Sequence, residues 1–232
     1  RNIGKKICDY YNEIAKNRNE LWYSNNRGIP FLPINEPDGQ DYITHMNFAL
    51  HFAQLNRHVM MQDIKRCLKY DMGCEIKYDI DINIHHNYAA LENHLGKNVC
   101  VHRKGATAAN EETTGIIPGS MGTSSYIVKG LANKLSLKSC SHGAGRSMGR
   151  KAFNLLYNTP EKIQEIEDKL IGVVYSKFGR SGRGRDIGMK DVSEAPQAYK
   201  DIEDVMDNQK DLVTILHKLK PLISWKSNDN VD

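Results

Sequence analysis

The chain has 232 residues, of which 40% are hydrophobic and 26% charged, and it is predicted to form one large globular domain or two small ones. The sequence contains no run of 18 apolar residues, so no membrane span is predicted. The net charge of +4 permits a nucleic-acid partner without requiring one. The five cysteines are odd in number and lack CxxC spacing, which favours a reducing, cytoplasmic compartment over a disulfide framework.

Helical periodicity dominates the first 70 residues. Apolar residues recur at helical spacing over 3–14 and again over roughly 44–70, which predicts two helices. Between them, residues 34–43 contain a proline and an Asp-Gly pair, and this composition predicts a loop.

The remainder of the chain is predicted to mix strands with helices. Isoleucines alternate with polar residues over 79–84, which predicts a half-buried strand that runs into His85 and His86. The other predicted elements are strands at 98–103 and 124–129 with the turn-rich residues 115–122 between them, a short helix after Thr159, a Gly/Arg loop over 178–188, and a last helix over about 201–219. The predicted fold class is α+β, with mixed strands and flanking helices.

His86 stands at the end of the predicted strand. A histidine in such a place suits a metal ligand, because the strand fixes the backbone while the side chain leaves the core. Most histidines of this kind are ordinary surface or core residues, so both interpretations stay open at this point.

Two short segments are rich in glycine and small hydroxyl residues. The first, "IIPGSMGTSSY", would let backbone amides approach an anion, although a simple hairpin turn explains it equally well. The second, "SHGAGR", places His142 beside Gly143 and Gly145. Arg146 and Arg150 would share one face if a helix follows, and could then clamp a phosphate. An imidazole in this setting is typical of a nucleophile that attacks phosphorus.

Further cations occur in "HRKGA" (102–106) and in the loop at 180–185, and these could follow a nucleic-acid backbone. Charge clusters of this kind are usually solvated faces. Together, however, the signals favour phosphoryl or nucleotidyl transfer over any one of the ordinary interpretations.

Five ordered segments resemble one family, the RtcB-type RNA-splicing ligases. They are "HHNYAALENH", "HRKGATAA", "GIIPGSMGTSSYIVKGL", "CSHGAGRSMGR" and "EAPQAYKDIEDVMDNQKDLV". The resemblance implies an enzyme that uses GTP and Mn²⁺ to join RNA ends bearing a 3′-phosphate or a 2′,3′-cyclic phosphate to 5′-hydroxyl ends. It further implies a covalent histidine–GMP intermediate, with His142 as the nucleophile.

The resemblance also implies roles for individual positions. His86 would bind manganese. The residues expected to contact the guanine nucleotide are His86, Asn87, Pro118, Gly119, Ser120, Met121, Ser125, His142, Gly143, Ala144, Gly145 and Lys226. The residues expected to hold RNA phosphates are Arg1, Lys104, Arg146 and Arg150.

The chain departs from the family pattern at both ends. Lys226 is followed by "SNDNVD", where the family usually ends in Val-Lys-Gly soon after this lysine. The family's other metal ligands, a cysteine, an aspartate and two histidines, lie in N-terminal sequence that the 232 residues do not contain. The expectation is therefore that residues 1–232 form the C-terminal portion of a single ligase domain, with the N-terminal half as a partner. The alternative is a non-catalytic RNA- or nucleotide-binding remnant.

Overall fold

The computed structural model describes residues 2–18, 31–73, 75, 77–175 and 190–224. It divides into two compact units, Arg1–Ala90 and Leu91–Asp232. Helices and antiparallel strands both occur, which confirms the predicted α+β class. None of the helices in the described ranges is long and apolar enough to cross a membrane. The Gly/Arg loop expected over 178–188 lies outside the described residues.

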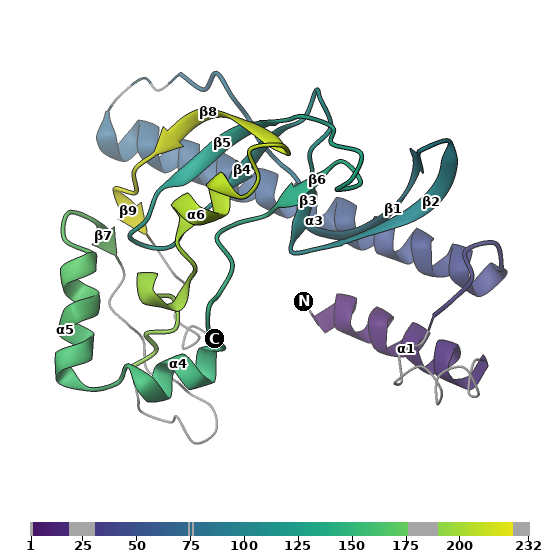
Figure 1. Cartoon of the computed structure of the whole chain (residues 1–232), viewed down its shortest axis with the longest axis horizontal. Helices are drawn as coiled ribbons and strands as arrows, with labels where there is room; N and C mark the ends of the chain where they lie inside the picture. The colour runs from purple at the N-terminus through teal and green to yellow at the C-terminus, as the bar shows by residue number, and fades with distance from the viewer. Residues whose placement is uncertain (1, 19–30, 74, 76, 176–189, 225–232) are drawn as a thin grey trace. The chain divides into compact units, whose positions relative to one another are not determined.

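The first unit contains the helices α1 (Asn2–Arg18) and α3 (Pro37–Met72), which confirms both predicted helices (Figure 1). Tyr11 joins them: its hydroxyl lies 2.7 Å from Nδ1 of His45, and its ring meets that of Tyr42 edge-on. The side chain of Tyr11 is only 6% exposed, so it forms the centre of this small helix–helix contact.

The loop predicted over 34–43 is wrong from Pro37 onwards, because α3 begins there. Proline is tolerated in a first helical turn, where its missing N–H would have no intrahelical acceptor. Gly39 serves a close approach instead of a turn, since a Cβ added there would stand 2.1 Å from the carbonyl oxygen of Pro33.

The strand predicted over 79–84 is also wrong, because residues 77–85 belong to no helix or strand. This segment runs along α3 instead. Nε of Arg57 donates to Oδ1 of Asn83 at 2.7 Å, and Nδ2 of Asn83 donates to the carbonyl oxygen of Gln54 at 3.1 Å. The contact with α3 is therefore made by a polar residue of the alternating pattern, while Ile80 is 48% exposed.

The strands form small antiparallel sheets, apart from one parallel pair. A three-stranded sheet has the order β4-β5-β8, and the two-stranded pairs are β1-β2, β3-β6 and the parallel β7-β9 (Figure 1). Two predicted strands are confirmed as β2 and β5. The strands are β1 (Asn87–His94), β2 (Lys97–Lys104), β3 (Ala106–Ala108), β4 (Thr114–Ile117), β5 (Ser125–Gly130), β6 (Ser139–Ser141), β7 (Val174–Tyr175), β8 (Val213–Leu219) and β9 (Ile223–Ser224).

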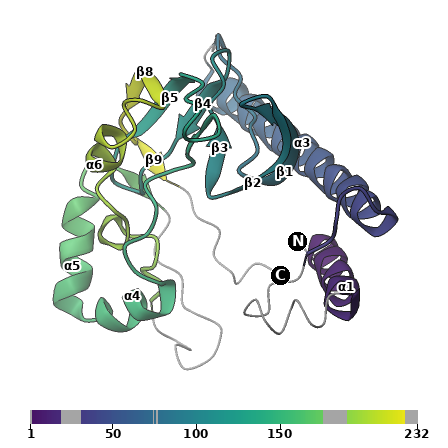
Figure 2. The same cartoon turned by 45° about the vertical axis from the view of Figure 1, so that its right-hand side comes forward.

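The helices of the second unit are short. They are α4 (Arg150–Leu156), α5 (Pro160–Lys169), the 3-10 helix η2 (Pro196–Ala198) and α6 (Ile202–Asp207). The helix predicted after Thr159 is confirmed as α5, and the Thr159 side chain accepts a hydrogen bond from the backbone amide of Lys162. Within this unit α4 and α5 lie together, away from the sheet β4-β5-β8 (Figure 2).

The last predicted helix, over about 201–219, is correct only at its start. α6 ends at Asp207, and the chain then turns and enters β8. The turn is held by Gln209, a buried side chain that accepts from the backbone amide of Ser141 and donates to its hydroxyl. β8 pairs with β5 from Ser125↔Leu219 to Gly130↔Val213, so tertiary pairing overrides the helical spacing of the apolar residues.

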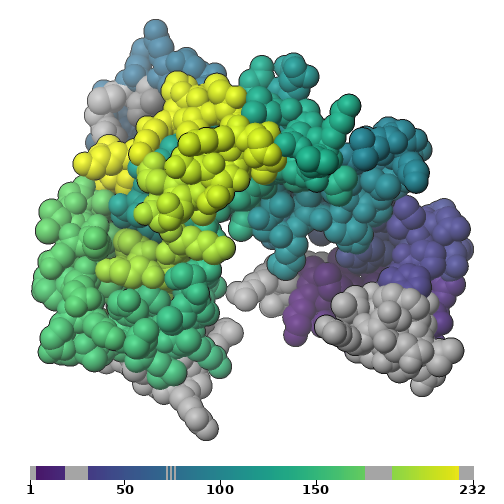
Figure 3. Space-filling view, in the orientation of Figure 1, coloured from purple at the N-terminus to yellow at the C-terminus, as the bar shows by residue number. Residues whose placement is uncertain are grey.

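Two apolar clusters form the core of the second unit. One lies between the sheet and α6 and includes Ile117, Tyr126, Val128 and Met206. The other lies among α4, α5 and η2 and includes Met121, Phe153 and Ile166. In Figure 3 the described residues of this unit are drawn in teal, green and yellow. Residues 118–121 and 142–145, which contain many of the predicted site residues, adjoin these two clusters.

Candidate functional site

His142 directly follows β6, and β6 pairs with β3 so that Ala106 lies opposite Ser141. The backbone amide of His142 lies 3.4 Å from the carbonyl oxygen of Gly105. Gly105 has φ +72°, and a Cβ added there would stand 3.4 Å from Cε1 of the imidazole. The glycine therefore permits both a left-handed backbone and a close approach to the ring.

The two glycine-rich loops lie against each other. The amide of Ala144 donates to the carbonyl oxygen of Pro118 at 2.9 Å, and a Cβ on Gly143 would stand 3.0 Å from the same oxygen. Residues 118–121 and 142–145, which the sequence places more than twenty positions apart, thus lie side by side. The contact brings together most of the nucleotide-contacting residues predicted in the second unit, although Met121 and Ala144 are buried.

The loop after β4 is a tight turn that is held by hydroxyl groups. Oγ1 of Thr123 accepts from the amide of Ser120 at 2.7 Å and lies 2.9 Å from its Oγ. A Cβ on Gly119 would stand 2.2 Å from the carbonyl oxygen of Ser124, so only glycine fits there. Thr123 was not among the predicted site residues, although its hydroxyl shapes the turn.

Two other predicted contacts of this loop lie in different surroundings. Met121 is 3% exposed and belongs to the apolar cluster around Phe153, so the structure places this residue in the core. Ser125 is the first residue of β5 and is half-buried. The roles of both residues remain predictions.

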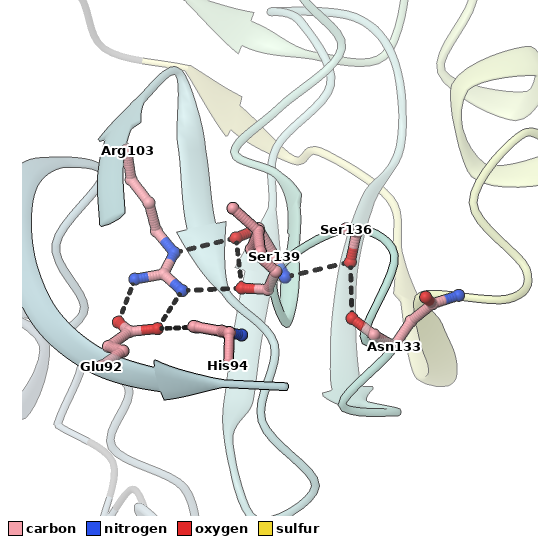
Figure 4. Close-up of polar contacts among 7 residues, drawn as sticks. Glu92, His94, Arg103, Asn133, Ser136 and Ser139 are labelled. Atoms are coloured by element: carbon pink, nitrogen blue, oxygen red, sulfur yellow. Dashed lines mark hydrogen bonds and ion pairs between the residues drawn. The ribbon is translucent and has the colours of Figure 1, made fainter. Parts of the chain in front are cut away.

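Behind β6 lies a polar network centred on Arg103, whose side chain is 1% exposed. Its guanidinium forms a bidentate ion pair with the carboxylate of Glu92, in which Nη2 lies 2.9 Å from Oε2. Nε donates to Oγ of Ser139 at 3.0 Å, and Nη2 also donates to the carbonyl oxygen of Leu137. Nε2 of His94 lies 2.8 Å from Oε2 of Glu92 (Figure 4). The network joins the β1-β2 hairpin to the strand that precedes His142.

The ion pair with Arg103 lowers the pKa of Glu92 from its ordinary value of 4.5 to about 2, and the hydrogen bond with His94 adds to this shift. Arg103 was predicted to be one of several cations along a nucleic-acid backbone, and that prediction is wrong for this residue. Its neighbours His102 and Lys104 are exposed. Strand alternation is the signal that could have separated Arg103 from them, since it also places Glu92 and His94 on one face.

Arg146 and Arg150 lie near each other, but not on one face of a helix as predicted. α4 begins only at Arg150, so the two residues do not share a helix. Instead both approach Oε1 of Glu194, Nη2 of Arg150 at 2.7 Å and Nη1 of Arg146 at 3.8 Å. The pairing raises the pKa of Arg150. The Tyr199 hydroxyl donates to Oε2 of the same carboxylate at 2.7 Å.

Arg146 makes several further contacts. Nη1 donates to the carbonyl oxygen of Ser193 at 2.6 Å, Nε donates to that of Met148, and the guanidinium lies 5.0 Å from the centre of the Tyr199 ring. Its Nη2 is buried and has no hydrogen-bond partner among the described residues. Glu194 was not predicted as a site residue, because the segment that it begins, "EAPQAYKDIEDVMDNQKDLV", was assigned no individual site residues.

The predicted metal ligand His86 belongs to the first unit, where it is exposed just before β1, and Asn87 is the first residue of that strand. Burial and the neighbouring charges of Arg57 and His86 lower the pKa of His85. Within residues 2–18, 31–73, 75, 77–175 and 190–224, no group of three His, Cys, Asp or Glu side chains could hold a metal ion. Arg1 and Lys226 lie outside the described residues.

Comparison with known proteins gives one consistent answer. The family model for tRNA-splicing ligase RtcB matches residues 1–227. RNA-splicing ligase RtcB1 of Escherichia coli strain ATCC 25922 is 34% identical, and RNA-splicing ligase RtcB of strain K12 is 33% identical; each match covers 97% of this chain and 54% of the relative. The tRNA-splicing ligase RtcB of Pyrobaculum aerophilum is 32% identical over 89% of this chain and 46% of its own length.

The chain therefore spans about half the length of the curated relatives that it matches. The matched residues 1–227 include all five motifs. The chain belongs to the RtcB family of RNA- and tRNA-splicing ligases.

Proposed function

We propose that this chain supplies the nucleotidyl-transfer half of an RNA ligase that uses GTP and Mn²⁺. The complete enzyme would join RNA ends bearing a 3′-phosphate or a 2′,3′-cyclic phosphate to 5′-hydroxyl ends, as in tRNA splicing or RNA repair. The observation that carries the proposal is the contact between Ala144 and Pro118, which unites the two glycine loops beside His142.

His142 is the proposed nucleophile. Of its two ring nitrogens Nδ1 is buried, which favours Nε2 as the attacking atom. In the first step Nε2 forms a bond to the α-phosphorus of GTP, the bond from that phosphorus to the bridging oxygen breaks, and pyrophosphate leaves. The ring must be neutral to attack. The product is GMP covalently bound to His142.

Two further transfers complete the proposed reaction. The RNA 3′-phosphate attacks the phosphorus of the histidine-bound GMP, which releases His142 and activates the RNA end. The 5′-hydroxyl of the second RNA then attacks the activated 3′-phosphate, and GMP leaves. A 2′,3′-cyclic phosphate would first be opened by hydrolysis.

The glycine loops would hold the nucleotide through backbone amides. Among the described residues, apart from Gly145 itself and its two chain neighbours, no heavy atom lies within 4 Å of the position that a Cβ on Gly145 would take, and this residue has φ +72°. Such a backbone leaves room for phosphate oxygens near the amides. Ser120 and Ser125 would add hydroxyl contacts, and Asn87 and Lys226 are proposed to complete the guanine nucleotide site.

Manganese is the proposed metal, and His86 offers one exposed imidazole that fits it as a ligand. The remaining ligands would come from the part of the ligase that this chain does not span. When bound, the metal would offset negative charge on the triphosphate and on the leaving pyrophosphate. RNA phosphates are proposed to contact Arg1, Lys104, Arg146 and Arg150. Action in the cytoplasm remains a prediction.

The proposal is tested with GTP labelled at the α-phosphate, in the presence of Mn²⁺. The chain alone is expected to retain no label, because a single imidazole cannot hold manganese tightly. Combined with the N-terminal part of the ligase, it is expected to retain label through an acid-labile, base-stable bond. His142→Ala should abolish labelling, and His86→Ala should reduce it at least about a hundredfold by removing a metal ligand.

His102→Ala is the matched control, since His102 is an exposed histidine on β2 and is expected to leave labelling unchanged. Label that persists in His142→Ala would exclude this residue as the nucleophile. Strong labelling of the chain alone would show that it assembles a complete metal site by itself.

A further inference from the structure

The long helix α3 carries an apolar stripe, which we define as Phe48, Phe52, Leu55 and Val59. The spacing i, i+4, i+7, i+11 places these side chains on one face of the helix. They are 65%, 65%, 51% and 57% exposed, respectively. Large apolar side chains in a row at this exposure are typical of a protein interface.

The helix α1 is too short to cover this stripe. With 17 residues it is about 26 Å long, whereas α3 with 36 residues is about 54 Å long. α1 contacts α3 through Tyr42 and His45, near the start of α3. The apolar stripe begins just after this contact and continues for three turns.

The charge pattern of α3 also marks the stripe as a surface for burial. Between residues 44 and 62 the only Asp, Glu, Lys or Arg is Arg57, and its guanidinium bonds to Asn83. The following residues 63–71, by contrast, contain five such charges in nine positions. A helix that met only water would carry charges along both segments.

The relatives of this chain are longer than the chain itself. The Escherichia coli relatives align with this chain over 54% of their length, so the family fold contains almost as much chain again. We propose that the apolar stripe of α3 is the docking surface for that remaining part of the ligase. This inference rests on the proposed role of the chain as one half of an RNA ligase. The occupant is a folded polypeptide with a complementary apolar face, because the stripe offers no charges to a nucleic acid.

The first test measures association without GTP, Mn²⁺ or RNA, so that its outcome does not depend on the proposed chemistry. The partner is the portion of the Escherichia coli K12 relative that does not align with this chain, added as a separate polypeptide. The double variant Phe52→Glu, Leu55→Glu is expected to raise the Kd at least about tenfold, because two charges would enter an apolar contact. The fold of the chain should not change, since both positions are exposed in it.

The matched control is Leu155→Glu, since Leu155 is 63% exposed on α4 and lies outside the stripe. It is expected to leave the Kd within about twofold of the unmodified chain. An equal effect of the control and the double variant would overturn the proposal. The proposal would also be overturned if this chain formed a dimer that the double variant dissociates but that the added polypeptide does not dissociate.

A second measurement covers the case in which the separate polypeptides do not associate. The same portion of the relative is fused ahead of this chain, and labelling of Leu55→Cys by a thiol reagent is located by mass spectrometry. Protection of this cysteine in the fusion, with Leu155→Cys labelled equally in both forms, is the expected result. If Leu55→Cys reacts as fast in the fusion as in the chain alone, the stripe is not covered and the proposal fails.

Discussion

Two arginine clusters lie on either side of His142 in the sequence, and they differ in how their charges are satisfied. The Arg103 cluster (Glu92, His94, Arg103) is buried and precedes β6, with side-chain exposures of 23%, 4% and 1%. The Glu194 cluster (Arg146, Arg150, Glu194) follows the His142 loop, with exposures of 22%, 68% and 23%.

The difference separates a structural role from a binding role. In the Arg103 cluster Nε, Nη1 and Nη2 all donate to protein oxygens, so this guanidinium has no remaining surface for a ligand. In the Glu194 cluster one carboxylate serves two arginines, and most of the Arg150 side chain faces solvent. We infer that the first cluster holds β6 in place and that in the second cluster Arg150 is available to phosphates.

The largest expected effect comes from breaking the Arg103 cluster. Glu92→Gln should lower the free energy of unfolding by about 3 to 4 kcal/mol, because it leaves a buried guanidinium without its counter-charge. Urea unfolding followed by circular dichroism measures the change.

Two variants test this interpretation. Glu92→Leu combined with Arg103→Met should recover much of the loss, because no unpaired charge is then buried. Asp207→Asn removes a partner from the exposed pair with Lys210 and should change stability by less than about 0.5 kcal/mol. A similar loss in both single variants would place the Arg103 cluster among ordinary surface pairs.

A pH titration should sharpen the same contrast. The pKa of Glu92 is about 2 in the folded chain against an ordinary 4.5. The pair therefore contributes fully above about pH 4.5, and its contribution, about 3 kcal/mol, is lost as the pH falls towards 2. The stability difference between the unmodified chain and Glu92→Gln should shrink over this range. A constant difference would mean that the Glu92 charge is not the source of the stability.

The helices show which parts of the fold the sequence could predict. α5 was recognised because its start signals are local: Thr159 caps the first turn and a proline follows it. β8 was predicted as a helix because its apolar residues also fit helical spacing, and the choice between the two is made by β5, more than eighty residues away. Pairing at that distance has no local signal in a single sequence.

The candidate site residues likewise include some that local motifs indicate and some that no local signal indicates. The glycines and His142 could be proposed as site residues from short motifs, since close approach needs small residues whatever the surrounding fold. Glu92 and Glu194 could not, because each acts through an arginine that is distant in sequence, 11 positions away for Arg103 and 44 for Arg150. A carboxylate that pairs inside the protein looks the same in sequence as one on a solvated surface.

The smallest expected effect concerns the Glu194 cluster and tests its availability to RNA. Glu194→Gln removes the negative charge that Arg146 and Arg150 share, while an amide can still accept the hydrogen bond from Tyr199. The stability should change by less than about 1 kcal/mol, since Arg150 is mostly exposed. Affinity for a single-stranded RNA with a 3′-phosphate should rise a few-fold at low salt, because the exposed Arg150 can then face a phosphate.

Fluorescence anisotropy over a range of KCl concentrations measures this effect. We expect the plot of the logarithm of the association constant against the logarithm of the salt concentration to become steeper by up to about 0.7 for each added phosphate contact. Lys210→Gln, a charge change away from the cluster, is the control and should leave the affinity nearly unchanged. Weaker binding by Glu194→Gln would reverse the interpretation: the carboxylate would then orient the arginines for RNA instead of competing with it, and the Glu194 cluster would be as much a structural device as the Arg103 cluster.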